Sequence, residues 1–395
     1  MSNYETYKAA FQGRQMPFAY VDLDLLDANI RQIVARAGGK PIRVASKSIR
    51  SLPILQHILA ADPALRGVLC FTAPEAVYLS RQGLDDLVIG YPIWHPAQIA
   101  AVCAQVRQGK TIVAMVDSRE HVAHLEAIAC AQGVVLPVCL DIDLSTDFPG
   151  LHFGVWRSSI FTPRQALAVY RAIAHSPHLR LDGLMGYEAQ IAGVGDQVPG
   201  QRVRSALIRA LKRRSIAQIA ERRARTVALL ARHGARLRFV NGGGTGSLES
   251  TRAEPCVTEV TAGSGFFAPA LFDHYRAFRH APAAGFAVEI VRKPKPGIYT
   301  CSGGGYIASG ATGPEKQPQP YLPPGARLLP LEGAGEVQTP VAYQGPVPPA
   351  LGDPIFLRHS KAGELCERFN TLLLLRQGRV VDEVPTYRGA GLCFL

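Results

Sequence analysis

Short apolar runs alternate with amphipathic stretches along the first two thirds of the chain. Runs of strand length occur eight times before residue 285, at 18–21, 42–45, 67–71, 87–90, 111–116, 134–141, 181–187 and 238–241. Between most of them, apolar positions recur with helical spacing, as in 96–108 and 118–130. Strands that alternate with helices predict a parallel sheet, and eight such units predict a (β/α)8 barrel.

The pattern changes near residue 285. Helical spacing disappears, Gly and Pro become frequent, and the short runs at 337–342, 354–357 and 371–376 predict antiparallel strands. We therefore expect an α/β chain of two domains. The barrel is predicted over residues 17–284 and an all-β domain over residues 285–395, with a contribution from residues 1–16 left open.

Composition places the chain among globular proteins with a sizeable core. Of its 395 residues, 47% are hydrophobic and 19% are charged. No apolar run approaches the roughly 18 residues of a membrane span, and the first 15 residues lack the apolar core of a signal peptide. The eight cysteines are scattered without a C-x-x-C pair, which favours reduced thiols. We expect a cytoplasmic protein without a membrane partner.

The net charge of +12 is concentrated in one segment. Between Gln201 and Arg238 stand twelve Lys or Arg and a single acid, Glu221. A nucleic-acid surface is one interpretation, which a steep salt dependence of binding would reveal. Because no aromatic residue interrupts the charges before Phe239, a solvated helix face near an anionic site is favoured, and no nucleic-acid partner is expected.

A glycine-rich loop at 241–247 follows the last predicted barrel strand. Four glycines in five residues allow backbone N–H groups to approach a ligand closely, and Thr245 and Ser247 add hydroxyl groups. This combination predicts a phosphate site, the alternative being a tight turn without a ligand. The loop lacks the lysine of a Walker motif and the spacing of a dinucleotide fingerprint.

Lys47 follows the apolar run at 42–45, so a strand carries it to the barrel rim. A partly desolvated lysine has a lowered pKa and can act as a nucleophilic amine, although a lysine reaching solvent from a strand end is the plain alternative. An amine and a phosphate cradle on one rim point to pyridoxal 5′-phosphate, bonded to Lys47.

Several segments resemble one known group of enzymes. Residues 43–47, 70–76, 240–247 and 259–265, together with His359, are similar to the D-threonine aldolase and D-serine dehydratase group, relatives of alanine racemase. The resemblance runs from about residue 17 to the C-terminus. It implies a fold-type III pyridoxal-phosphate enzyme and a set of cofactor-binding residues: Lys47 as the Schiff-base lysine, Gly242, Gly243, Gly244, Thr245 and Ser264 at the phosphate, Tyr187 near the ring, and His152 where the group has an arginine facing the pyridine nitrogen.

The group's metal site differs in this chain. The resemblance places one metal ligand at His359 and a Cys or Asp two residues later, where this sequence has Lys361. The sequence therefore leaves open whether the protein binds a divalent metal. If Lys361 swings away, the second ligand is Cys366 or Glu364, and Cys366 only if the loop folds back. We favour Lys361 as a fixed charge that replaces the metal.

The resemblance implies carbon–carbon lyase chemistry on D-3-hydroxy amino acids. Lys47 would exchange the cofactor onto the substrate, and His359 would take the β-hydroxyl proton directly or through water. The alternatives are β-elimination by a dehydratase and racemisation, for which no second tyrosine can be assigned. A non-catalytic pyridoxal-phosphate carrier is disfavoured, because such carriers resemble the barrel alone. We expect a homodimer, in which the second domain of one subunit closes the barrel mouth of the other.

Overall fold

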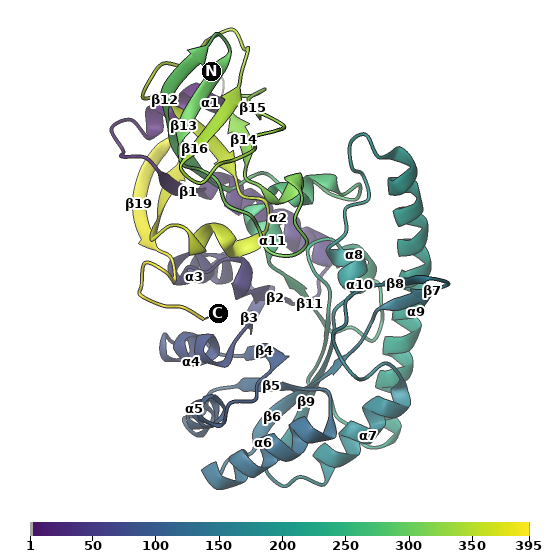
Figure 1. The fold of residues 1–395 in the computed structure, drawn as a ribbon. Helices are drawn as coiled ribbons and strands as arrows, with labels where there is room; N and C mark the ends of the chain where they lie inside the picture. The colour runs from purple at the N-terminus through teal and green to yellow at the C-terminus, as the bar shows by residue number, and fades with distance from the viewer. Residues whose placement is uncertain (1–2, 395) are drawn as a thin grey trace.

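The computed structural model describes residues 3–394 and contains a closed barrel of eight parallel strands (Figure 1). Their order around the barrel is β10-β11-β2-β3-β4-β5-β6-β9. The strands are β2 (Ile42–Ala45), β3 (Leu65–Cys70), β4 (Leu87–Pro92), β5 (Ile112–Val116), β6 (Leu136–Ile142), β9 (Leu179–Gly186), β10 (Phe239–Gly242) and β11 (Glu259–Ala262). The predicted (β/α)8 barrel is thus confirmed.

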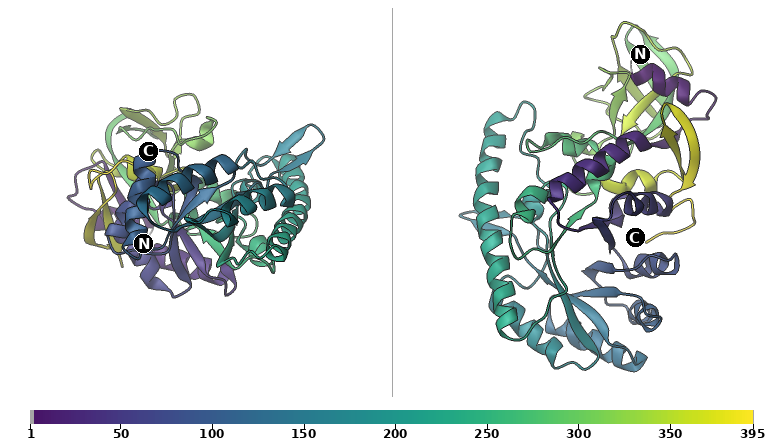
Figure 2. Two further views of the ribbon diagram at one scale, coloured as in Figure 1. Left: turned by 90° about the horizontal axis from the view of Figure 1, so that it is seen from below. Right: turned by 180° about the vertical axis from the view of Figure 1, so that it is seen from behind.

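Helices surround the strands, as the left view of Figure 2 shows. Their ends follow local sequence signals: Thr162 and Gln165 form a capping box at the start of α7 (Pro163–Ala174), and α6 (Arg119–Gln132) ends at Gly133, which has a left-handed backbone. The helices are α2 (Leu23–Ala37), α3 (Leu52–Ala61), α4 (Ala73–Arg81), α5 (Pro96–Arg107), α6 (Arg119–Gln132), α7 (Pro163–Ala174), α8 (Ala189–Ala192), α9 (Arg202–Arg232), α10 (Leu248–Arg252) and α11 (Ser264–Phe267).

One predicted barrel strand lies elsewhere. β1 (Phe18–Asp22) pairs antiparallel with β12 (Ala284–Lys295) and parallel with β18 (Thr371–Arg376), so the prediction that 18–21 opens the barrel is wrong. The missing barrel strand is β11, between β10 and β2. Its inward side chains are polar: Glu259 accepts from buried Arg43 at 2.8 Å, and Thr261 donates to Asn241 at 3.0 Å. A search for apolar runs misses a strand stabilised in this way.

The second domain is a nine-stranded sheet that includes β1. Its other strands are β12 (Ala284–Lys295), β13 (Ile298–Ser302), β14 (Gln319–Leu322), β15 (Arg327–Leu328), β16 (Gln338–Ala342), β17 (Pro354–Arg358), β18 (Thr371–Arg376) and β19 (Arg379–Pro385). The three strands predicted after residue 285 are therefore present. α1 (Asn3–Ala10) packs on this sheet through Tyr4 and Tyr7, which contact Phe356. The domain boundary between residues 284 and 285 stays a prediction.

The basic segment forms one 31-residue helix, α9, which runs along one side of the barrel (Figure 2). Most of its charges are exposed, as predicted for a solvated face, but two are buried. Lys212 pairs with Asp196 at 3.3 Å, and fully buried Arg223 pairs with Glu188 at 3.0 Å. Across residues 3–394, none of the helices combines the length and the apolar character needed to cross a bilayer.

Candidate active site

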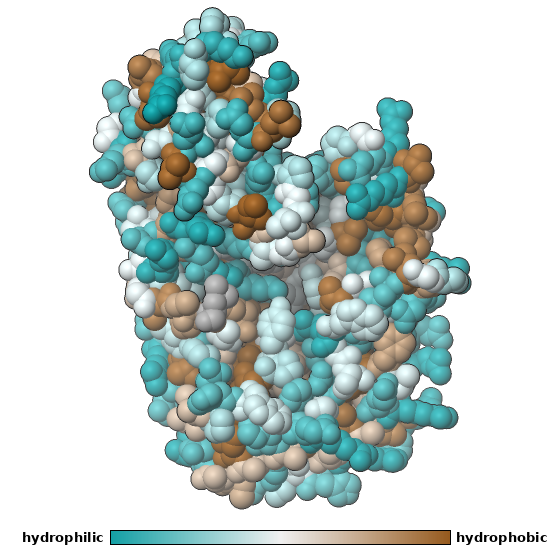
Figure 3. Space-filling model, viewed as in Figure 1, coloured by the Kyte–Doolittle hydropathy of each residue, from teal (hydrophilic) through white to brown (hydrophobic). Residues whose placement is uncertain are grey.

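A cavity of about 530 Å³ lies at the carboxyl ends of the barrel strands, where the second domain faces them. Figure 3 shows the molecule hollowed between the lobe of the second sheet and the barrel below it. We call this cavity the rim pocket. Its walls include eight of the side chains or glycines predicted from the sequence: Lys47, His152, Tyr187, Gly243, Gly244, Thr245, Ser264 and Lys361.

Lys47 is positioned by a single turn, η1 (Ser46–Ser48), that follows β2. Its carbonyl accepts from Arg50 at 3.0 Å, and its ammonium donates to the hydroxyl of Tyr91, also at 3.0 Å. Burial disfavours the phenolate of Tyr91, but the charges of Lys47 and Arg157 outweigh burial and lower its pKa. The Lys47 amine and a phenol of lowered pKa are therefore adjacent in the pocket.

The glycine loop forms a second wall of the rim pocket. Gly243 has φ +93°, and a Cβ on Gly244 would lie 2.8 Å from Cβ of Ala192. The Thr245 hydroxyl accepts from the Gly265 N–H at 2.9 Å, which links the loop to the turn after β11. Glycine backbone without intervening side chains therefore forms this wall of the pocket, as a phosphate cradle requires.

A buried ion-pair network supports this loop from beneath. Arg223 pairs with Glu188 at 3.0 Å and with Glu254 at 2.5 Å. Glu188 also accepts from the hydroxyl of Ser247 at 3.0 Å. A Cβ on Gly242 would lie 2.8 Å from the Arg223 guanidinium, so Gly242 is behind the cradle and does not line the pocket.

His152 lies in β8 (Leu151–Phe153), which pairs with β7 (Thr146–Phe148) as a hairpin at the pocket. Its Nδ1 is 2.7 Å from Asp147, and its ring stacks on Trp156 with centroids 3.7 Å apart. Its Nε2 is buried without a partner among the described residues. That atom is free for a ligand, but whether it faces a pyridine nitrogen stays a prediction.

Arg157 and Tyr187 complete the wall beside Tyr91. The Arg157 guanidinium contacts Asp141 at 2.9 Å and donates to the Gly90 carbonyl at 2.6 Å. It also lies 5.8 Å from the Tyr187 ring centroid. Burial raises the pKa of Tyr187 to about 12, with the charge of a neighbouring glutamate adding to the effect, so this phenol stays protonated.

His359 is not part of the pocket wall. Its ring is fully buried, and neither ring nitrogen has a partner within residues 3–394. Burial, followed by the charge of Arg358, lowers its pKa to about 3. This position does not support the predicted role of His359 as a base that reaches the substrate.

Lys361 and Cys366, the two residues weighed for the second position of the expected metal site, already have hydrogen-bond partners. The Lys361 ammonium donates to the Ser309 hydroxyl at 3.0 Å, and the Cys366 thiol donates to the Ile49 carbonyl at 3.2 Å. Burial raises the pKa of Cys366 to about 12, which disfavours the thiolate that binds metals. No group of three or more His, Cys, Asp or Glu side chains suited to hold a metal ion occurs within residues 3–394. Cys366 as a second ligand beside His359 therefore stays a prediction.

The pocket lining also includes residues that were not identified from the sequence, among them Tyr91, Arg157 and Lys316. Tyr91 directly follows the run at 87–90, so the rule that chemistry collects at strand ends could have found it. Arg157 follows an inserted hairpin, and Lys316 comes from the second domain. Neither position carries a periodic signal.

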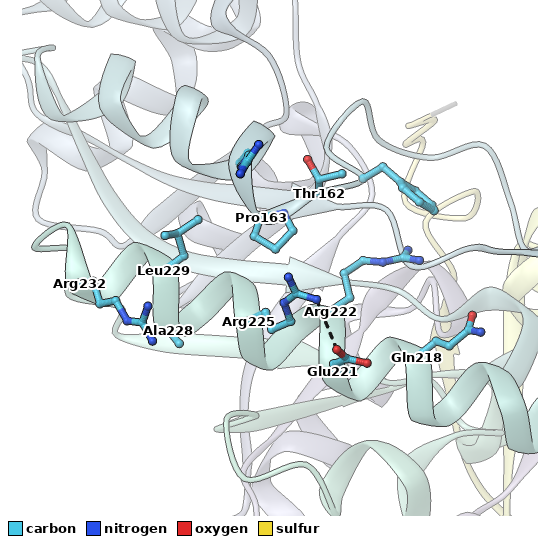
Figure 4. Close-up of a pocket in the computed structure, with 11 residues that line it drawn as sticks. Thr162, Pro163, Gln218, Glu221, Arg222, Arg225, Ala228, Leu229 and Arg232 are labelled. Atoms are coloured by element: carbon cyan, nitrogen blue, oxygen red, sulfur yellow. Dashed lines mark hydrogen bonds and ion pairs between the residues drawn. The ribbon is translucent and has the colours of Figure 1, made fainter.

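A larger cavity of about 680 Å³ lies outside the barrel between α7 and α9 (Figure 4). It is basic, and two of its arginines already have partners. Arg222 donates to the carbonyls of Asp143 and Ser145 at 3.0 and 2.9 Å, and Arg225 pairs with Glu221 at 3.3 Å. Because it holds neither an available amine nor a glycine cradle, the rim pocket is the candidate active site.

Comparisons with known proteins agree on the fold. The solved D-threonine aldolase of Filomicrobium marinum superposes with a TM-score of 0.80 at 20% identity, covering 95% of each chain. D-threo-3-hydroxyaspartate dehydratase from Delftia sp. HT23 gives a TM-score of 0.74 at 20% identity, covering 95% of this chain and 98% of the other.

Curated relatives match over part of their length. The 3-hydroxy-D-aspartate aldolase of Paracoccus denitrificans is 28% identical over 257 residues, and the D-threonine aldolase of an Arthrobacter species is 26% identical over 253 residues. Each match covers 64% of this chain and 60% of the relative. The family model for the alanine racemase N-terminal domain matches residues 21–268, which is most of the barrel. The chain therefore belongs to the alanine racemase N-terminal domain family.

Proposed function

We propose that this chain is a pyridoxal-phosphate-dependent lyase that cleaves the Cα–Cβ bond of D-3-hydroxy amino acids. The observation that carries the proposal is the presence of the Lys47 amine and the glycine cradle in one pocket. The names of the curated relatives, 3-hydroxy-D-aspartate aldolase and D-threonine aldolase, support the reaction class.

The cradle fits the phosphate of the cofactor. Gly243, Gly244 and Thr245 would hold it from one side, with Ser264 from the turn after β11 on the other. Ser264 and Ser48 hydroxyls are 3.4 Å apart and both line the pocket. Pyridoxal phosphate, when bound, supplies an aldehyde for the lysine amine and an electron sink for charge that develops at Cα.

The protein's own groups bind the substrate and move protons. Lys47 lies at the pocket wall as the amine that the substrate displaces, and Tyr91 holds that amine through a hydrogen bond of 3.0 Å. Since His359 is away from the wall, the groups placed to hold the β-hydroxyl proton are the Lys47 amine and the Tyr91 phenol. Lys361 contributes a fixed positive charge for a substrate oxygen in place of a metal.

β-Elimination is the second candidate, and Lys361 is the observation that favours it. An ammonium group in the pocket can donate a proton to a departing hydroxide, which elimination requires. Aldol cleavage instead requires removal of the hydroxyl proton. The two reactions differ in their products, an aldehyde with glycine against ammonia with a keto acid.

Borohydride reduction tests the cofactor assignment. The protein loaded with pyridoxal phosphate should be yellow, and reduction followed by peptide mapping should find the cofactor on Lys47. Lys40→Ala is a suitable control, because Lys40 donates to the Glu254 and Val257 carbonyls outside the pocket. A reduced adduct on another lysine, or full activity in Lys47→Ala, would contradict the proposal.

The assembly is proposed to be a homodimer in the cytoplasm. Apolar side chains stand exposed beside the pocket, including Trp156 at 86% and Val155 at 45%. A second domain from a partner would cover them and exclude water from the site. Sedimentation should give a dimer at micromolar concentration, and a fully active monomer would contradict this. The eight free cysteines suit a reducing compartment.

A further inference from the structure

We propose that Lys316 and Lys361 form an anion subsite that binds a second carboxylate, carried on the side chain of the substrate. The preferred substrates would then be D-3-hydroxy amino acids with an acidic side chain. This inference rests on the proposed lyase function and assigns a specificity role to Lys316.

The two lysines converge on the pocket from separate segments of the second domain. Lys316 ends the turn η3 (Pro314–Lys316), and Lys361 precedes η4 (Ala362–Glu367). Their Nζ atoms lie 3.6 and 4.0 Å from the point that a Cβ on Gly310 would occupy. The Lys361 ammonium is fixed by the carbonyl and hydroxyl of Ser309, at 3.2 and 3.0 Å.

The charges around this pair are unbalanced. Four cations line the rim pocket, Lys47, Arg157, Lys316 and Lys361, while no Asp or Glu does. Arg157 is already matched by Asp141 at 2.9 Å. Within residues 3–394, neither Lys316 nor Lys361 forms an ion pair with a carboxylate. The neighbouring Glu364 accepts instead from the Ser309 N–H at 2.9 Å.

Two unpaired ammonium groups so close together repel each other, and a bound anion offsets this electrostatic repulsion. Burial, and after it the charge of Lys316, lower the pKa of Lys361, while the charge of Glu364 acts in the opposite direction. The cofactor phosphate has its own cradle on the barrel side, at Gly243 to Thr245. An α-carboxylate alone carries one negative charge against the two ammonium charges, whereas a substrate with a second, side-chain carboxylate carries enough charge to balance both.

A specificity ratio tests the subsite. The loaded enzyme is assayed with D-3-hydroxyaspartate, as both Cβ epimers, and with D-threonine. The ratio is kcat/KM for D-3-hydroxyaspartate divided by kcat/KM for D-threonine. In Lys316→Met this ratio should fall about 10- to 100-fold, mainly through KM for the acidic substrate, because a charge-assisted hydrogen bond is lost. Lys316→Arg should restore most of it. Lys293→Met, at an exposed position of β12 outside the pocket, is the matched control.

Equal losses on both substrates would overturn the inference, since the lysines would then bind the shared α-carboxylate. No change in the ratio would also overturn it. Titration of succinate into the loaded enzyme gives a readout without turnover, and it should bind about 10-fold more weakly to Lys316→Met. If no substrate is cleaved by the wild type, the lyase proposal fails, while the succinate titration still decides the subsite.

Discussion

The Lys47 ammonium donates to the phenol oxygen of Tyr91 at 3.0 Å, joining residues from the ends of two barrel strands. The Arg157 guanidinium lies 5.1 Å from the Tyr91 ring centroid on the same wall. This contact links the proposed covalent residue to a phenol whose pKa is lowered, so proton exchange at Lys47 depends on Tyr91.

Tyr91→Phe removes the acceptor of the Lys47 proton. The protonated nitrogen of Lys47 loses a stabilising contact, so the pH midpoint of the cofactor absorbance should fall by about 1 unit. Absorbance titration of the loaded protein measures it. Tyr170→Phe is the matched control, because Tyr170 is on α7 and outside the pocket. A midpoint that does not move would show that the contact has no effect on the bound cofactor.

Gly244→Ala tests the cradle. The new Cβ would lie 2.8 Å from Cβ of Ala192 and 3.3 Å from the Tyr187 ring, so the loop must shift. Affinity for pyridoxal phosphate, measured by titration of the cofactor-free protein, should fall at least about 10-fold. Ser250→Ala, on α10 and away from the pocket, should retain wild-type affinity. Unchanged affinity in Gly244→Ala would place the phosphate elsewhere.

His359 should make folding sensitive to acid. Its pKa is about 3 in the folded protein and about 6.5 in the unfolded chain, so the unfolded chain binds the extra proton between these values. The contribution of this group to the free energy of unfolding is therefore full above about pH 6.5. It decreases by on the order of 1 kcal/mol per pH unit as the pH falls toward 3. Denaturant midpoints between pH 7 and 4.5 should fall less steeply for His359→Gln. His175→Gln, at an exposed position, is the control. Parallel slopes for His359→Gln and wild type would refute this assignment.

Chelation tests the replacement of a metal by Lys361. Lys361 stands two residues after His359, where a second ligand was expected, and its charge would repel an ion there. Activity should survive exhaustive chelation and fall at least about 10-fold in Lys361→Met. One tightly bound divalent ion per chain, with activity lost on its removal and regained on its return, would reverse this conclusion.

Much of the fold was predictable because apolar runs and helical spacing recur in the barrel. The sheet to which a strand belongs was not: β1 has the expected pattern but pairs with β12, whereas β11 owes its place to the buried Arg43–Glu259 pair. Both require long-range contacts that no local window contains.

The candidate site was likewise predictable where local sequence patterns mark it, and not where long-range packing sets it. Lys47, Gly243 and Thr245 were found from strand ends and glycine spacing, and all three line the pocket. The position of His359 was set by burial, which a sequence motif does not report. Lys316 reaches the pocket only because the second domain folds against the barrel.

Glycine formation is the most direct measurement of the central claim, because Cα–Cβ cleavage of any 3-hydroxy amino acid releases it. The protein loaded with pyridoxal phosphate and supplied with D-threonine or D-3-hydroxyaspartate should release glycine and the matching aldehyde in equal amounts. Ammonia should stay at background, and Lys47→Ala should produce no glycine. Ammonia and a keto acid without glycine, or glycine formed equally well by Lys47→Ala, would contradict the account.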